Sequence, residues 1–425
     1  GFMGPVAKHH LQKSNDPLLR QPDFRIGRQG AEAHFDGLLR GEAGTDHVEV
    51  NARGREVRVL SQIPPKTGKD LKLTLVSSIQ QAAELGLKDY RGAISLMDVE
   101  NGHVLAMASA PDFNPNDFVY GLGNKAWDSF KKETTNPLLN RCCRGRYPPG
   151  STFKLIVALA ALEEGIIDAE TQIDCSGKMH FGDRDFHCWK EDGHGPMTIH
   201  QAIAESCDIY FYELGRQLGI EKIKQYTDKI GLSEKTGLFL PESEGVIPDN
   251  AWKMRVIGRP WQKGEDLISA IGQGYLLLTP MQITLMTARL ASGLMLIPTL
   301  VNQGQRPLFE PLPFKKKNLD IIRQAMVATV TEPYGTAYAS RLTQTAFGGK
   351  TGTSQVVSQR FGQDIDWSEI SEEKRTHALF TAFGPAEKPR FALNVLLENA
   401  GSGSRAAAPV GRDVFLAALK WTRKV

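Results

Sequence analysis

This sequence has a small net charge, few cysteines and no long apolar run. Its 425 residues carry 51 Lys and Arg against 48 Asp and Glu, and a net charge of +3 is too small to indicate nucleic acid as a partner. The five cysteines are few and odd in number, which argues against a full disulfide framework. No apolar run is long enough to cross a bilayer, because the best candidate, after Lys154, is interrupted by Glu163 and Glu164.

The start of the chain also lacks two features. It opens on GFMGPVAKHH, with neither an initiator methionine nor a signal peptide, so we expect a trimmed sequence whose membrane anchor, if any, precedes Gly1. The overall composition, 41% hydrophobic and 23% charged, is typical of a globular protein. The length suits one large domain and a smaller one.

A change in pattern near Lys66 predicts the division between these domains. The preceding part is polar and rich in Gly and Arg, and residues 46–65 alternate apolar and polar side chains, which predicts short strands. The turn-rich stretch PPKTGKD follows. We therefore expect a small, β-rich domain over residues 1–66 and a large domain over residues 67–425.

The large domain is predicted to be α/β (α+β). Over residues 71–87 the apolar pattern changes from the period of a strand to that of a helix. The further expected elements are a hairpin over 92–111, a buried helix over 152–165, helices over 206–232, a strand over 391–399 and a helix over 411–424. Because strands lie at both ends of this region and helices lie between them, we expect one sheet closed by distant segments.

The stretch RYPPGSTFKL places Ser151 and Lys154 one helical turn apart after a rigid lead-in. One interpretation is structural, with Ser151 as a helix cap and Lys154 as a surface charge. The other is a nucleophile beside a helix N-terminus, with a lysine on the same face that is within reach as its base. On its own this spacing is a weak signal.

Two further segments strengthen the second interpretation. ESCDIYF carries Ser206 and Asp208, and FGGKTGTSQ carries Lys350 in a K-T-G sequence. The order S-x-x-K, then a motif like S-x-N, then K-T-G is the signature of penicillin-recognising serine acyltransferases. Each segment alone could be a helix cap or a strand end, but the three in this order point to catalysis.

With these motifs the chain resembles a known family, the class B penicillin-binding proteins, and within that family the type-2 elongation transpeptidases. The resemblance covers nearly the whole chain, through GRQGAEAHFDGLLRGEAG, VNARGREVRVL, AMASAPDFNPNDFV, RYPPGSTFK, AIGQGYLLLTPMQ, GGKTGTSQ and ENAGSGSRAAAPV. It implies the penicillin-recognising fold, a sheet flanked by helices plus an all-helical lobe, behind a small β-rich pedestal. The implied activity is peptidoglycan D,D-transpeptidation during cell elongation.

The resemblance also implies catalytic roles. Ser151 would attack the D-Ala-D-Ala carbonyl of a stem peptide, with Lys154 as its base. Ser206, together with Lys350, would relay a proton to the leaving amine. One residue departs from the pattern: Asp208 stands where an asparagine is expected, and an ionised aspartate only accepts hydrogen bonds. Its expected partners are Lys154 and a donor on the substrate.

The K-T-G segment is implied to bind the substrate. Lys350, Thr351 and Thr353 would hold the substrate carboxylate, and Gly352 would let the substrate backbone lie flat against the strand. The backbone N–H groups of Ser151 and Thr353 would form the oxyanion hole.

The resemblance further implies location and partners. The implied partners are stem peptides, β-lactam antibiotics, a SEDS-family glycosyltransferase and elongation scaffold proteins. The implied location is the bacterial inner membrane, with a single-pass anchor in the membrane and the catalytic domain in the periplasm. Two other functions stay open: a serine β-lactamase, for which no deacylating base is evident, and a β-lactam sensor domain.

Soft metal ligands gather between the first two motifs. Cys175, Cys188, His194 and Cys207 suit a tetrahedral, structural zinc, while catalysis itself needs no cofactor. The alternatives are a Cys175–Cys188 disulfide or buried free thiols. His180 or His187 could replace one ligand, and the adjacent Cys142 and Cys143 stay unassigned.

Overall fold

The structure is a computed structural model that describes residues 1–123, 127–128, 130, 135–302, 304, 307–355 and 375–422. Contacts divide the chain into two compact units. The first comprises Gly1–Leu73, Asp112–Leu138 and Phe239–Pro241, and the second comprises Thr74–Pro111, Leu139–Leu238 and Glu242–Val425. The first unit thus takes in more of the chain than residues 1–66.

The first unit contains two separate antiparallel strand pairs. These are β1 (Phe2–Pro5) with β2 (Arg25–Gln29) and β3 (Thr45–Val50) with β4 (Glu56–Ile63), so the strands predicted within 46–65 are confirmed. The remaining elements are short: α1 (Lys8–Lys13), η1 (Pro17–Arg20), α2 (Gly30–His34), α3 (Asp36–Arg40) and η2 (Pro115–Phe118).

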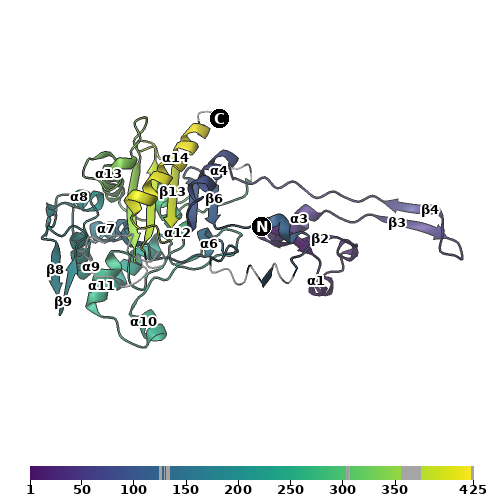
Figure 1. Cartoon of the computed structure of the whole chain (residues 1–425), viewed down its shortest axis with the longest axis horizontal. Coiled ribbons are helices and arrows are strands. Elements are labelled where there is room, and N and C mark those ends of the chain that lie inside the picture. The colour runs from purple at the N-terminus through teal and green to yellow at the C-terminus, as the bar shows by residue number, and fades with distance from the viewer. Residues whose placement is uncertain are drawn as a thin grey trace. The chain divides into compact units, whose positions relative to one another are not determined.

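The second unit is built on one five-stranded antiparallel sheet of order β11-β12-β13-β5-β6. Its strands are β5 (Gly92–Asp98), β6 (Val104–Ala110), β11 (Gly348–Ser354), β12 (His377–Gly384) and β13 (Phe391–Leu397). The expected sheet of distant segments is therefore confirmed. Figure 1 shows this directly, since the dark β6 and α4 lie close to the yellow β13 and α14.

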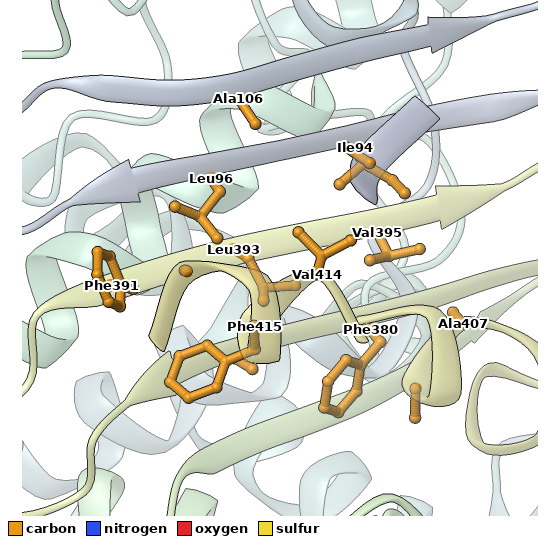
Figure 2. Packing of buried hydrophobic residues seen from close by; sticks show 14 of the residues in the cluster. Ile94, Leu96, Ala106, Phe380, Phe391, Leu393, Val395, Ala407, Val414 and Phe415 are labelled. Carbon is orange, nitrogen blue, oxygen red and sulfur yellow. The ribbon is translucent and has the colours of Figure 1, made fainter. Parts of the chain in front are cut away.

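One face of this sheet is apolar because side chains alternate between the two faces of each strand. On it, Ile94, Leu96, Leu393 and Phe380 are buried against the two helices that cover it, and Phe415 comes from one of them (Figure 2). These helices are α4 (Ser77–Gly86) and α14 (Ala408–Thr422). The opposite face packs on α12 (Pro280–Ser292).

Helices make up most of the remaining second unit. They are α6 (Arg141–Arg144), α7 (Lys154–Glu163), α8 (Ile199–Ala204), α9 (Asp208–Lys229), α10 (Asn250–Ile257), α11 (Lys263–Ala270) and α13 (Lys316–Thr331), with the short turns η3 (Gly150–Thr152), η4 (Tyr338–Ser340) and η6 (Gly403–Ala407). Every residue from Lys154 to Leu162 is buried, as the apolar sequence of this helix predicts. Helix α9 is interrupted at Gly219, whose φ is 68°.

Four short strands lie between α7 and α8. β7 (Ile173–Cys175) pairs with β10 (Gly195–Met197), and β8 (Lys178–Phe181) pairs with β9 (Arg184–His187). The pairing of β7 with β10 brings Cys175 opposite Gly195, the neighbour of His194. Across the part of the chain that the structure describes, none of the helices has the length and apolar character needed to span a membrane.

Candidate active site

Ser151 lies in the tight turn η3, directly before α7. Gly150 N donates a hydrogen bond to Gly272 O (2.9 Å), which ties the turn to the segment after α11. The φ of Gly150 is 52°, and a Cβ there would lie 2.8 Å from Thr353 O. Only glycine satisfies both conditions, so the lead-in brings Ser151 directly against β11.

Lys154 is completely buried and its ammonium group has three acceptors. Lys154 Nζ lies 2.7 Å from Asp208 Oδ1, 3.0 Å from Ser206 O and 3.4 Å from Ser206 Oγ. No hydrogen bond joins it to Ser151 Oγ within the described residues, because these three acceptors take the three N–H donors of the ammonium group. The lysine therefore joins the first motif to the second.

Asp208 opens α9, and both of its oxygens are engaged. Oδ1 accepts from Lys154, and Oδ2 accepts from the backbone N–H of Trp189 (3.0 Å). Burial raises the pKa of this carboxyl group, and the positive charge of Lys154 acts in the opposite direction. An asparagine would offer one acceptor where this site uses two, which gives a physical reason for an aspartate at this position.

Ser206 has a strained backbone. Its φ of 58° lies in the left-handed region, which costs a residue other than glycine roughly 1–2 kcal/mol. Two backbone hydrogen bonds, Ser206 N to Ile203 O (3.2 Å) and Cys207 N to Ala202 O (3.0 Å), hold the turn, and Lys154 binds the carbonyl oxygen of Ser206. This conformation keeps Ser206 Oγ beside the ammonium group of Lys154.

Lys350 is also completely buried, on the edge strand β11. Its Nζ donates to Thr351 O (3.1 Å), and no carboxylate among the described residues pairs with it. Burial lowers the pKa of Lys350 well below its usual range, and the charge of Lys154 lowers it further. Asp208 therefore pairs with Lys154 and acts on Lys350 only through its charge, which partly offsets the lowering of the Lys350 pKa.

The three residues after Lys350 are held by different neighbours. The hydroxyl oxygens of Thr351 and Thr336 lie 2.7 Å apart, Thr353 is exposed, and Gln273 Nε2 donates to Thr353 O (3.3 Å). A Cβ on Gly352 would lie 3.1 Å from Thr152 Cγ2, so glycine lets β11 approach the nucleophile's turn closely. This gives Gly352 a packing role beside the substrate role that the resemblance implies.

The four metal-ligand candidates converge. One ligand atom from each of Cys175, Cys188, His194 and Cys207 lies within 4.8 Å of the other three, and all five cysteines of the chain are free. His194 Nδ1 is 3.4 Å from Cys175 Sγ and 3.6 Å from Cys188 Sγ. His180 instead pairs with Asp185 through an exposed side chain (2.8 Å).

Thiol chemistry in this cluster suits a cation. Contact with the Cys207 thiol lowers the pKa of Cys175 to about 6 and of Cys188 to about 3, while the same contacts raise the pKa of Cys207, so two of the three sulfurs favour the thiolate form. Backbone N–H groups point at the sulfurs, from Asp208 to Cys188 Sγ (3.4 Å) and from Tyr210 to Cys207 Sγ (3.5 Å). Three thiolates and an imidazole at these separations fit a closed tetrahedral zinc site.

The cluster and the second motif share a short segment of chain. Cys207 directs its sulfur into the cluster, while Ser206 and Asp208 on either side contact Lys154. Cys188 accepts from Asp208 N, and its neighbour Trp189 donates to Asp208 Oδ2. The cluster therefore supports the back of the catalytic loop.

Three residues that contribute to the site were not predicted from the sequence. Trp189 binds Asp208 through its backbone and Glu205 O through its indole N–H (3.0 Å), and Thr336 and Gln273 contact the K-T-G strand. Gln273 lies in one of the stretches that carry the family resemblance. No local pattern marks the other two, because their contacts join distant parts of the sequence.

A partly buried serine in a tight turn, two buried lysines and an edge strand carrying K-T-G match the motif set of the penicillin-recognising serine acyltransferases. The family described as penicillin binding protein transpeptidase domain matches residues 92–416, and the penicillin-binding protein dimerisation domain matches residues 1–73. The chain therefore belongs to the penicillin-binding protein transpeptidases.

Individual relatives and solved structures are similar to this chain over nearly its whole length. The chain is 38% identical, over 98% of its length, to peptidoglycan D,D-transpeptidase MrdA of Acinetobacter baumannii, and it spans 63% of that protein. The penicillin-binding protein PBP2 of Helicobacter pylori, solved in complex with MreC, has a TM-score of 0.90 at 33% identity, over 99% of this chain and 76% of that one. A chain of a peptidoglycan synthase complex, from work on the coordination of polymerization and crosslinking, has a TM-score of 0.85 at 34% identity, over 98% and 73%.

Proposed function

We propose that this chain is a serine-type peptidoglycan D,D-transpeptidase that cross-links stem peptides during cell elongation. The observation that carries this proposal is the convergence of the three motifs: Lys154 contacts Ser206 and Asp208, and the turn of Ser151 packs closely against β11. The MrdA relative, named as a peptidoglycan D,D-transpeptidase, supports the same reaction.

In the proposed acylation, Ser151 Oγ bonds to the carbonyl carbon of the penultimate D-Ala, and the bond to the terminal D-Ala nitrogen breaks. The serine proton passes to Lys154 and then, through Ser206 and Lys350, to the leaving amine. In the second step, the amine of another stem peptide bonds to the ester carbon, the bond to Ser151 Oγ breaks, and the amine proton passes through Lys154 to Ser151 Oγ. Asp208 touches no reacting atom here, and its role is to position Lys154.

We assign substrate binding to β11. It is an edge strand, so its outer backbone groups can pair with an extended peptide, and Thr351 and Thr353 supply hydroxyls for the terminal carboxylate. Lys350 contributes the positive charge of this segment. The backbone N–H groups of Ser151 and Thr353 are proposed as the oxyanion hole.

We also propose a structural zinc held by Cys175, Cys188, His194 and Cys207. A closed set of four protein ligands leaves no position for a substrate, so the ion would supply folding stability and no chemistry. His194 Nε2 is buried, and its nearest acidic neighbour is Glu205 at 4.0 Å, which suits a ring that binds through Nδ1.

We also propose partners and a cellular location for this chain. The solved complex of the Helicobacter PBP2 contains MreC, and another similar chain belongs to a peptidoglycan synthase complex. We infer an elongation scaffold protein and a SEDS-family glycosyltransferase as partners, and β-lactams as inhibitors. The inferred location is the periplasm, with a single-pass anchor in the inner membrane.

The test is acylation by a penicillin followed by mass spectrometry. We expect a stable adduct on Ser151, none on Ser151→Ala, and acylation slowed by orders of magnitude in Lys154→Ala, which removes the base. Labelling of any other residue would contradict the assignment. Rapid release of hydrolysed penicillin would indicate a β-lactamase, and a stable adduct without turnover of D-Ala-D-Ala peptides would indicate a sensor.

A further inference from the structure

A row of polar side chains crosses the central sheet beneath Lys350. The strand register pairs Lys350 with Thr381, Thr381 with Asn394, and Asn394 with Ser95. Residues paired across strands point to the same face, and all four side chains are 0% exposed. This face packs on α12 and is opposite to the apolar face in Figure 2.

The two hydroxyls of the row have partners on α12. Ser95 Oγ lies 2.6 Å from Thr284 Oγ1, and Thr381 Oγ1 lies 2.5 Å from Thr287 Oγ1. Thr381 also donates to Leu393 O (2.9 Å). A hydroxyl oxygen has two lone pairs, so these groups can still accept from a further neighbour.

Asn394 has no such partners. Its Oδ1 and Nδ2 are both buried, and neither has a hydrogen-bond partner among the described residues. Its position, between Thr381 and Ser95 on the neighbouring strands, is completely enclosed. An unpaired amide in a dry core is strongly unfavourable, and native proteins satisfy such groups almost without exception.

Lys350, at the end of the row, is also under-satisfied. Its ammonium group has three donors, and Thr351 O is its one acceptor among the described residues. Asp208, the buried carboxylate of the site, is occupied by Lys154 and by the N–H of Trp189. Lys350 and Asn394 thus lie on one face of the sheet, and each has hydrogen-bonding groups without a partner among the described residues.

We propose that internal water binds between this row and α12, anchored by Asn394, and that the resulting hydrogen-bonded network holds the Lys350 side chain in place. Water both donates and accepts, and buried waters typically make about three hydrogen bonds to otherwise unsatisfied groups. The row contains no carboxylate to hold a cation. Asn394 and Thr381 are positioning residues, because they act through Lys350.

The role in positioning Lys350 rests on the proposed function, but the water site does not. A crystal structure at a resolution that shows internal waters tests the site directly. We expect a water within hydrogen-bonding distance of both Asn394 Oδ1 and Nδ2. A dry site, or an amide rotated onto Ser95 or Thr381, would refute it, whether or not the protein has transpeptidase activity.

The positioning role is tested with Asn394→Leu, which removes both amide groups at similar volume, and with Thr381→Val. We expect each to slow acylation by a carboxylated penicillin by about three- to tenfold, the factor of one net hydrogen bond. A neutral thioester acyl donor should be affected much less. Equal slowing of both donors, or no slowing of either, would refute the role.

Thr227→Val is the matched control. Thr227 is also completely buried, but among the residues that the structure describes its hydroxyl bonds only the carbonyl of Ile223 in its own helix (2.8 Å). It should leave both acylation rates unchanged. If it slows the penicillin reaction as much as Thr381→Val does, the effect reflects loss of a buried hydroxyl in general, and the proposal fails.

Discussion

Replacing Asp208 by asparagine separates charge from shape in the catalytic core. Both members of the Lys154–Asp208 pair are buried and 2.7 Å apart, and the second carboxylate oxygen accepts from Trp189 N. Removing one member of a buried pair typically costs about 3–5 kcal/mol. We expect the lower end of that range, because Lys154 keeps the carbonyl of Ser206 as an acceptor. With an unfolding entropy of about 2.1 cal/mol/K per residue over the second unit, a loss of about 3 kcal/mol predicts a melting temperature lower by about 4–5 °C.

Acylation should suffer as well, because Lys154 loses the group that orients it. We expect penicillin acylation of Asp208→Asn to slow by at least about tenfold, within the range of general-base effects. Glu42→Gln is the control, since Glu42 pairs with Lys66 at the same 2.7 Å but on the surface, where such pairs contribute about 0–1 kcal/mol. Similar melting temperatures for the two variants would refute the argument from burial.

Three further predictions concern other groups of the site. Lys350→Met should have a larger free energy of unfolding than the parent at pH 7. The folded state lowers the pKa of Lys350, so the unfolded chain binds the proton of this lysine more tightly and folding of the parent is penalised. Urea titrations should show the difference in unfolding free energy shrinking as pH rises toward 10.5. His194→Ala, or chelation of the parent protein, should lower the melting temperature and slow acylation while Ser151 stays intact, and elemental analysis should find zinc in the untreated parent only. Gly352→Ala should slow acylation several-fold and lower the free energy of unfolding by roughly 1–3 kcal/mol, because its Cβ would lie 3.1 Å from Leu379 Cβ and from Thr152 Cγ2 in the nucleophile's turn.

Elements with strong local signals were predictable from sequence. The hairpin over 92–111 has two apolar runs joined by a Glu-Asn-Gly turn, and the structure forms β5 and β6 there. The apolar run after Lys154 predicted a buried helix, and α7 is one. The cluster of Cys175, Cys188, His194 and Cys207 was predictable as a set of donors, because these residue types lie in one stretch.

Features that depend on tertiary contacts were not predictable. The order β11-β12-β13-β5-β6 and the buried row through Asn394 follow from strand register, which no single segment encodes. The preference of Lys154 for Asp208 over Ser151 depends on the fold bringing α7 and α9 together. The contact of Trp189 with the second motif similarly depends on the turns around the thiol cluster.

The pairing of β13 with β5 has a consequence for how the protein folds. Arg390 and Asp98, which form an ion pair beside these strands, are 292 residues apart in sequence. Folding rates fall as contacts become more distant in sequence, so the sheet should form late and slowly. As the chain grows from its N-terminus, β5 and β6 and the helix of the nucleophile are made long before β11 to β13. Until the last strands dock, β5 has an open edge that can pair with other chains, so aggregation competes with folding throughout this interval.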